Sequence, residues 1–233
     1  MSKLNSFEKI LGYYFKNPSI LISALTHPSY AFEHPDEGIE HNERLEYLGD
    51  AVLELFISDY LFRTFPQKSE GELTKLRARL VCAESLYELA FKIKLNDYLR
   101  LGKGELKAGG NRRMSNLANA VEAVIGAIYF DGGIEAGFNF INNLFGEKLT
   151  PSQLENIPKD EKTALQELVQ KNKSNVLRYE ILREEGPAHQ KVFTAGVFLN
   201  NKLLATGRGN SKKEAEQDAA RKALELLANS KEV

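Results

Sequence analysis

The stretch HNERLEYLGDAVL, residues 41–53, decides how the first half of the chain is organised. Its carboxylates Glu43, Glu46 and Asp50 stand at i, i+3 and i+7, a spacing that places all three on one face of a helix. The leucines and valines between them predict that this helix also packs against a core. Aligned like charges repel each other, by roughly a few tenths of a kcal/mol per neighbouring pair. A bound cation would relieve that repulsion.

A second apolar helix is expected at 116–133, NLANAVEAVIGAIYFDGG, where Gly132-Gly133 provides a stop signal. It supplies Asn119 and Glu122, again at i, i+3 on one face. Two helices that each offer oxygen atoms at this spacing are typical of a metal site between packed helices. Mg²⁺, a hard ion that prefers oxygen ligands, suits such a site. The alternative is a solvated acidic face paired with basic residues such as Arg44, and spacing leaves both interpretations open.

Helical periodicity extends over residues 1–149 and indicates an all-helical domain. Leu48, Val52, Leu55, Phe56 and Tyr60 predict a buried helix over 48–62, residues 72–93 predict two helices, and 135–149 closes this half. Residues 150–159, TPSQLENIPK, hold two prolines and little apolar periodicity, so we expect a linker there.

The pattern changes after the linker. Residues 160–172 predict an amphipathic helix, 176–183 a strand, and 183–189 a turn. Period-two alternation over 193–199 predicts a second strand, and Asn200-Asn201 turn the chain into a third over 202–207. Ser211 is expected to cap a long helix over 212–228. Residues 160–229 are therefore expected to form a small α+β module with the order α-β-β-β-α.

Charge and composition narrow the class of protein. The net charge is −1, but residues 160–233 carry 13 Lys+Arg against 11 Asp+Glu, so phosphate binding would depend on local clustering. Cys82, the single cysteine, excludes an internal disulfide and a cysteine-rich zinc site, and the four histidines lack metal-ligand spacing. No run of 18 uncharged apolar residues and no signal peptide is found in the sequence, which predicts a soluble, cytoplasmic protein without membrane contact.

The stretch 41–53 is very similar to the signature of the ribonuclease III family. Three further motifs fit in the family's order: ALTHPSY (24–30), SEGELTKLRARLV (69–81) and LANAVEAVIGAIYFDGG (117–133). The resemblance covers essentially the whole chain. It implies an all-α nuclease domain (1–149) that forms a homodimer, followed by a double-stranded-RNA-binding domain (160–229). The implied activity is a magnesium-dependent endonuclease of double-stranded RNA that leaves 5′-phosphate and 3′-hydroxyl ends and processes ribosomal RNA precursors and other structured transcripts.

The resemblance also assigns site residues. Glu46, Asp50 and Glu122 match metal-binding positions, with Asp50 and Glu122 catalytic, and the family implies Mg²⁺ with Mn²⁺ as a substitute. Two further acidic positions near the cleavage site are matched by Glu43 and Glu70. Asn119 departs from the pattern, because most of the family carries Asp there. An amide oxygen can still ligate Mg²⁺ but adds no negative charge, so this substitution puts metal affinity and rate in question.

The module 160–229 resembles a double-stranded-RNA-binding domain, most clearly in GNSKKEAEQDAARKAL (209–224). Ser211, Lys212 and Lys213 would stand at a helix start, where free backbone N–H groups and the helix dipole favour phosphate. By resemblance, Gln166 and Gln170 reach the minor groove of the RNA, and EGPAH (185–189) makes a second minor-groove contact through His189. Exposed glutamines and a solvated Lys-Lys pair are the ordinary alternatives for these residues.

Two other functions compete with the nuclease. The same fold could act as a double-stranded-RNA-binding protein whose cleavage is impaired by Asn119. An unrelated metal-dependent phosphohydrolase would leave the second module unexplained. A cleavage assay on a labelled duplex RNA with Mg²⁺ separates all three.

Overall fold

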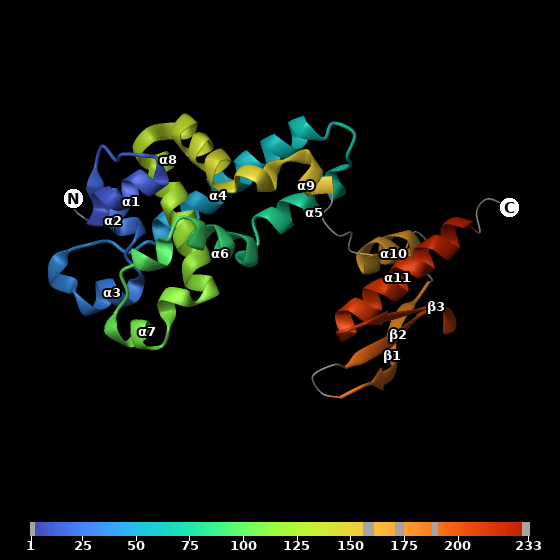
Figure 1. Ribbon diagram of the computed structural model, residues 1–233. Helices are drawn as coiled ribbons and strands as arrows, with labels where there is room; N and C mark the ends of the chain where they lie inside the picture. The colour runs from blue at the N-terminus through green and yellow to red at the C-terminus, as the bar shows by residue number, and fades with distance from the viewer. Residues whose placement is uncertain (1–2, 156–160, 171–174, 188–190, 230–233) are drawn as a thin grey trace. The chain divides into compact units, whose positions relative to one another are not determined.

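The computed structural model describes residues 3–155, 161–170, 175–187 and 191–229. The chain divides into two compact units, Met1–Asn156 and Ile157–Val233. Figure 1 shows the first as a group of helices and the second as a small sheet with two helices.

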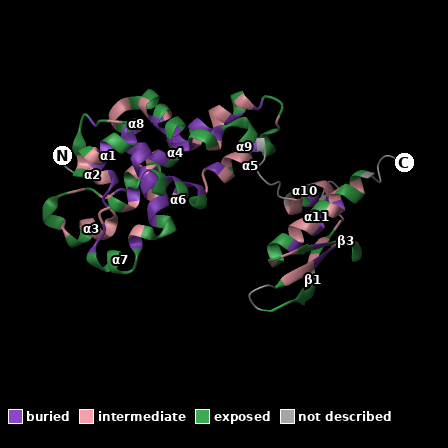
Figure 2. Ribbon diagram, in the orientation of Figure 1, coloured by how far each residue is buried: buried purple, intermediate pink, exposed green. Residues whose placement is uncertain are grey.

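Apart from an isolated β-bridge between Thr26 and Arg100, the regular secondary structure of the first unit's described residues is helical, as predicted. Its α-helices are α1 (Lys3–Leu11), α2 (Pro18–Ala24), α3 (Pro28–Glu33), α4 (Glu43–Thr64), α5 (Glu70–Leu80), α6 (Ala83–Lys92), α7 (Lys103–Lys107), α8 (Met114–Phe145) and α9 (Pro151–Glu155). Short 3₁₀ turns join them: η1 (Pro35–Glu37), η2 (Leu95–Asp97), η3 (Gly110–Arg112) and η4 (Gly146–Leu149). The core lies where α4 and α6 pack on α8, and Figure 2 shows the buried residues gathered there.

Helix α8 consists of two helical segments that meet at the stop expected at Gly132-Gly133. Gly133 has φ 80° and ψ −174°, which is not helical, so the first segment ends in a kink there and a second runs on to Phe145. A positive φ of this kind favours glycine. The predicted helix end is therefore confirmed.

Helix α4 buries only part of the apolar side expected from its periodicity. Val52 and Phe56 are buried, but Leu55 is 55% exposed, and Phe62, two helical turns further along α4, is 70% exposed. The reason is that α4 packs mainly against one partner, α8, which covers one stripe of its surface.

The expected linker 150–159 begins with a helix. Residues 151–155 form α9, and Leu154 in it is only 2% exposed, so this segment belongs to the first unit. The remaining residues of the expected linker, 156–159, lie outside the described residues.

The second unit has the predicted order, with α10 (Glu161–Gln170), β1 (Leu177–Glu185), β2 (Val192–Leu199), β3 (Lys202–Gly209) and α11 (Lys212–Asn229). The strands form an antiparallel sheet in the order β1-β2-β3. Asn200 and Asn201, both with positive φ, make the predicted turn between β2 and β3. Strand β1 runs to Glu185, so the connection to β2 is shorter than the turn expected at 183–189.

Both helices of this unit contribute to one apolar core. Leu165 and Val169 from α10 meet alanines of α11 and Val197 of the sheet. Gly207 on β3 lets α11 approach closely, because a Cβ there would lie 2.1 Å from the backbone nitrogen of Ala219. Because Gly207 has no side chain, α11 can lie this close to the sheet.

Candidate active site

The start of α4 is held by backbone hydrogen bonds from segments distant in the sequence. The Asn42 N–H donates to the Thr26 carbonyl at 2.9 Å, and the His27 N–H donates to the Arg100 carbonyl at 3.0 Å. Arg100 in turn donates from its backbone to Leu25 at 2.7 Å. The strand-like segment around Thr26 thus ties the residue before α4 to the chain around Arg100.

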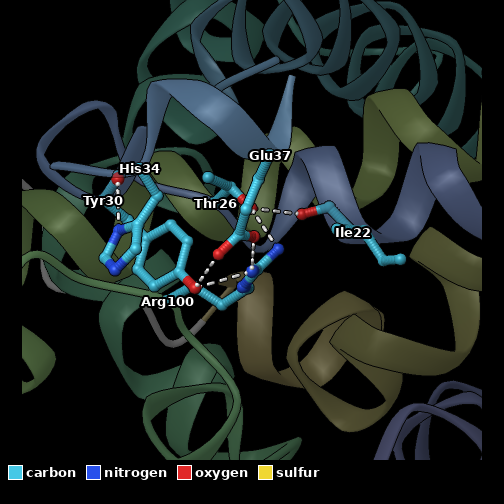
Figure 3. Close-up of polar contacts among 6 residues, drawn as sticks. All are labelled: Ile22, Thr26, Tyr30, His34, Glu37 and Arg100. Atoms are coloured by element: carbon cyan, nitrogen blue, oxygen red, sulfur yellow. Dashed lines mark hydrogen bonds and ion pairs between the residues drawn. The ribbon is translucent and has the colours of Figure 1, made fainter. Parts of the chain in front are cut away.

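Figure 3 shows a second connection made by the Arg100 side chain. Its guanidinium donates to Glu37 Oε2 at 2.7 Å and to the Tyr30 hydroxyl at 2.8 Å, and it stacks 4.2 Å from the centre of the Tyr30 ring. The Tyr30 hydroxyl donates to the other Glu37 oxygen at 2.9 Å. The Arg100 and Tyr30 hydrogen bonds lower the pKa of Glu37, which keeps the carboxylate ionised. This cluster orders η1, the turn that leads toward α4.

Two glycines bring α4 and α8 into backbone contact. A Cβ on Gly49 would lie 1.8 Å from the Glu122 carbonyl oxygen, and one on Gly126 would lie 2.1 Å from the Leu45 carbonyl oxygen. Neither position can hold a side chain without moving a helix. The close crossing brings the acidic face of α4 beside Asn119 and Glu122.

The pKa values show that these carboxylates act on one another. Burial raises the pKa of Glu122 to about 7, and the charges of Asp50 and then Glu46 add to the rise. Burial also raises the pKa of Glu46, with smaller contributions from Glu43 and Asp50. The Asn119 amide opposes this, because its hydrogen bond stabilises the ionised Glu46. The structure therefore places Glu46, Asp50, Asn119 and Glu122 near enough to one another to interact electrostatically.

The chemistry of this group fits a hard cation. Three carboxylates and one amide could offer oxygen donors, which Mg²⁺ prefers. A cation would offset both the burial and the mutual repulsion that raise the pKa values of Glu122 and Glu46. Among the described residues, no three His, Cys, Asp or Glu side chains already converge as a metal-binding group.

Two further acidic residues lie farther out. Glu43 is exposed at the first position of α4, with His41 Nδ1 3.5 Å from its carboxylate. Glu70 begins α5 and accepts a hydrogen bond from Thr74 of the same helix at 3.1 Å. Glu43 couples to the cluster through its charge on Glu46, whereas Glu70 stands on a separate helix.

Sequence patterns did not predict the polar network at the start of α8. Asn116, 9% exposed, donates to Glu105 at 2.8 Å and to the Gly110 carbonyl at 3.0 Å. Glu105 also pairs with Arg113. This network anchors the turn of α8 just before Asn119. The only sequence signal for it is Asn116 itself, a polar residue at the buried edge of an apolar helix.

Some of the side chains expected to contact RNA are exposed on the second unit. The Ser211 hydroxyl accepts from the Glu214 N–H at 3.1 Å and caps α11, which leaves Lys212 and Lys213 exposed at the helix start. Gln166 is exposed on α10. His189 and the side chain of Gln170 lie outside the described residues.

The apolar segment Met114–Leu149 is long enough to cross a membrane by length and composition. More than half of its most apolar window is buried inside the first unit, where α4 and α6 pack against it. It is the core helix of that unit.

Comparison with known proteins agrees with both units. Residues 17–149 match the ribonuclease-III-like family, and residues 161–227 match the double-stranded RNA binding motif. Ribonuclease 3 of Carboxydothermus hydrogenoformans is 80% identical, covering 99% of this chain and 98% of that protein. Ribonuclease 3 of Clostridium botulinum is 49% identical over 97% of this chain and 96% of that protein.

A solved nuclease domain of ribonuclease III from Campylobacter jejuni is also similar. It is 40% identical, with a TM-score of 0.59, and the match covers 64% of this chain and 99% of that domain. Together with the paired helices, the acidic cluster and the separate sheet unit, these likenesses show that the chain belongs to the ribonuclease III family, the endoribonucleases of double-stranded RNA.

Proposed function

We propose that this ribonuclease requires Mg²⁺, with Mn²⁺ as a substitute, and holds the ion with Glu46, Asp50, Asn119 and Glu122. The observation that carries the proposal is the pKa of Glu122, raised to about 7 by burial and by two neighbouring carboxylates. Perturbed acids of this kind cluster at functional sites. At such a site Mg²⁺ supplies polarisation of a phosphoryl oxygen and a lower pKa for the attacking water.

Each residue of the site has a proposed role beside the ion. Asp50 and Glu122 are the proposed catalytic residues, and they lie on the two helices that meet at Gly49. Their carboxylate oxygens would attract and orient the cation. Asn119 would contribute an oxygen, and its hydrogen bond partly opposes the rise in the pKa of Glu46. Glu43 and Glu70 would act farther out at the cleavage site. The proposed products carry 5′-phosphate and 3′-hydroxyl ends.

We further propose that the chain acts as a homodimer through its nuclease domain. Tyr47 is 82% exposed and Phe130 66% exposed beside a groove of about 920 Å³, and Leu55 and Phe62 border another of about 720 Å³. Exposed apolar surface of this kind marks an interaction site. The Campylobacter domain has a region described as involved in dimer formation. Two centres in one dimer would cut opposite strands and leave short 3′ overhangs.

For the second unit we propose that Lys212 and Lys213 bind RNA phosphates at the start of α11. Ser211, Gln166, Gln170 and His189 complete the proposed RNA contacts. Modules of this kind span about 16 base pairs and recognise A-form shape more than sequence. We propose a nuclease domain at 1–149 and an RNA-binding domain at 160–229, joined by residues 150–159, of which α9 packs with the nuclease domain. The proposed role is cytoplasmic processing of ribosomal RNA precursors and of other structured transcripts.

A cleavage assay tests the metal proposal. Purified protein is freed of metal with a chelator, incubated with an end-labelled RNA duplex, and given Mg²⁺, Mn²⁺ or Ca²⁺. We expect cutting with Mg²⁺ and Mn²⁺ and 5′-phosphate ends on the products. Full cleavage in the chelator would contradict the metal requirement. Binding without cutting in every metal would favour the RNA-binding protein impaired by Asn119.

A further inference from the structure

Glu184, near the end of β1, lies between two lysines of the second unit. Its Oε1 is 3.1 Å from the Lys212 ammonium at the start of α11, and its Oε2 is 3.3 Å from the ammonium of Lys191, just before β2. Each oxygen of the Glu184 carboxylate thus pairs with one lysine ammonium. One acidic residue therefore joins the helix start to the β1–β2 connection, two places that the sequence associates with RNA.

The sheet register makes this arrangement specific. Glu184 on β1 stands directly opposite Phe193 on β2, and the Lys212 ammonium lies 5.8 Å from the centre of the Phe193 ring. Lys212 is therefore oriented by a carboxylate and an aromatic face on neighbouring strands. The hydrogen bonds from Lys212 and then Lys191 lower the pKa of Glu184, so its carboxylate remains ionised at neutral pH.

An ionised carboxylate held by two ammonium groups has the chemistry of an RNA phosphate, which also presents anionic oxygens to lysines. We propose that Glu184 is an internal competitor for phosphate: it occupies Lys191 and Lys212 in the free protein, and a phosphodiester of double-stranded RNA takes its place on binding. Lys191 thereby becomes a further phosphate-binding residue. This inference rests on the proposed contact between Lys212 and RNA.

Competition of this kind has a measurable consequence. Two lysines and one glutamate present a local charge of +1, and removal of the carboxylate charge raises it to +2. Binding would then release more counterions from the RNA. Glu184→Gln should tighten binding about twofold to fivefold at moderate salt, in line with exposed ion pairs. It should also steepen the dependence of log K on log salt by up to about 1.

Glu180→Gln is the matched control. It removes the same charge on the same strand, but Glu180 pairs with Arg178 rather than with either lysine and lies outside the motif 185–189. Both glutamates are exposed, so we expect both variants to fold, and melting temperatures check this. Fluorescence anisotropy with a labelled RNA duplex, in Ca²⁺ without Mg²⁺ and over a series of KCl concentrations, gives affinity and salt slope for the full-length protein.

The expected result is tighter binding and a steeper slope for Glu184→Gln alone. Equal effects in the two variants would mean that only net charge matters, and weaker binding by Glu184→Gln would mean that the carboxylate helps binding; either result overturns the competition. Lys212→Ala with Lys213→Ala, measured in parallel, tests the underlying contact. Binding and a salt slope unchanged in that variant would refute the lysine contact itself, whatever Glu184→Gln does.

Discussion

At the scale of single residues, the acidic cluster is governed by the balance between burial and charge. Glu122 is partly buried and faces the charges of Asp50 and Glu46, and its pKa rises to about 7. Burial raises the pKa of Glu46, and the hydrogen bond from the uncharged Asn119 amide partly opposes that rise. In the proposed site, a cation would offset these unfavourable charges.

We expect Glu122→Gln to abolish or greatly slow cleavage while duplex affinity stays nearly unchanged. The amide keeps the shape of the side chain but removes one of the charges proposed to attract Mg²⁺. Single-turnover cleavage rates and gel shifts in Ca²⁺ measure the two effects separately. Turnover at the wild-type rate by this variant would remove Glu122 from the site.

The raised pKa of Glu122 also predicts how the stability of the metal-free protein depends on pH. The carboxyl binds its proton more tightly in the folded state, with a pKa of about 7 against an ordinary value of 4.5. Its contribution is therefore fully present below about pH 4.5 and is lost as pH rises through 7. Because Glu122 is only partly buried, we expect this loss to be on the order of 1–2 kcal/mol.

Urea unfolding in a chelator at pH 5 and pH 8 measures this loss. Glu122→Gln cannot titrate, so its stability relative to the wild type should be higher at pH 8 than at pH 5. The same relative stability at both pH values would show that the carboxyl is not perturbed in the folded protein.

We expect Asn119→Asp to lower the Mg²⁺ concentration required for half-maximal cleavage. The new carboxylate attracts the ion but repels its acidic neighbours and loses the amide hydrogen bond to Glu46, so the metal-free fold should be slightly less stable. Stabilisation by Mg²⁺ should therefore be larger in the variant, since an ion that binds the native state stabilises it. Mg²⁺ titrations of cleavage rate and of melting temperature measure both effects. No shift in either would place Asn119 outside the set of ligands.

At the scale of secondary-structure elements, the site depends on how closely α4 and α8 cross. Gly49 and Gly126 each face a backbone carbonyl of the opposite helix. The Arg100 cluster and the Glu105–Asn116 contact hold the segments that lead into these two helices. The helices thus place the carboxylates, and polar contacts at their starts restrain where the helices begin.

We expect Gly49→Ala to destabilise the fold by about 1–3 kcal/mol or more, because its Cβ would lie 1.8 Å from the Glu122 carbonyl oxygen. Gly71→Ala in α5 is the control, since a Cβ there meets nothing within 4 Å. It should stabilise the protein by about 0.5 kcal/mol through helix propensity. Urea unfolding measures both. A Gly49→Ala variant as stable as Gly71→Ala would mean that the two helices are not in close contact.

At the scale of the whole molecule, the nuclease unit and the RNA-binding unit have separate cores, one around α8 and one around the sheet. The nuclease unit exposes large apolar side chains, among them Tyr47 and Phe62. A second copy of the chain would cover this surface and supply a second centre.

We therefore expect Tyr47→Ser to weaken the dimer at least about tenfold, which corresponds to about 1.4 kcal/mol. Tyr47 is 82% exposed beside the larger groove, so the loss of its ring removes apolar surface from the proposed interface. Tyr14→Ser provides a control, because Tyr14 is 64% exposed but lines neither groove. Sedimentation equilibrium measures both dissociation constants. Equal constants for the two variants would exclude Tyr47 from the interface.

The amino-acid sequence by itself determined the elements and the acids that they carry. A period of 3.6 residues places Glu46 and Asp50 on one face of α4, and Asn119 and Glu122 on one face of α8, because neighbours along a helix depend only on local geometry. The same local rules determined the strands of the second unit, the Asn200-Asn201 turn and the Ser211 cap.

Only the tertiary structure decided how these elements meet. The exposure of Leu55 and the presence of α9 in the expected linker both depend on packing partners that a periodic pattern does not identify. The raised pKa of Glu122 and the pairing of Glu184 with Lys212 arise between residues far apart in the chain. Such couplings follow from distance and burial, which exist only once the elements have packed.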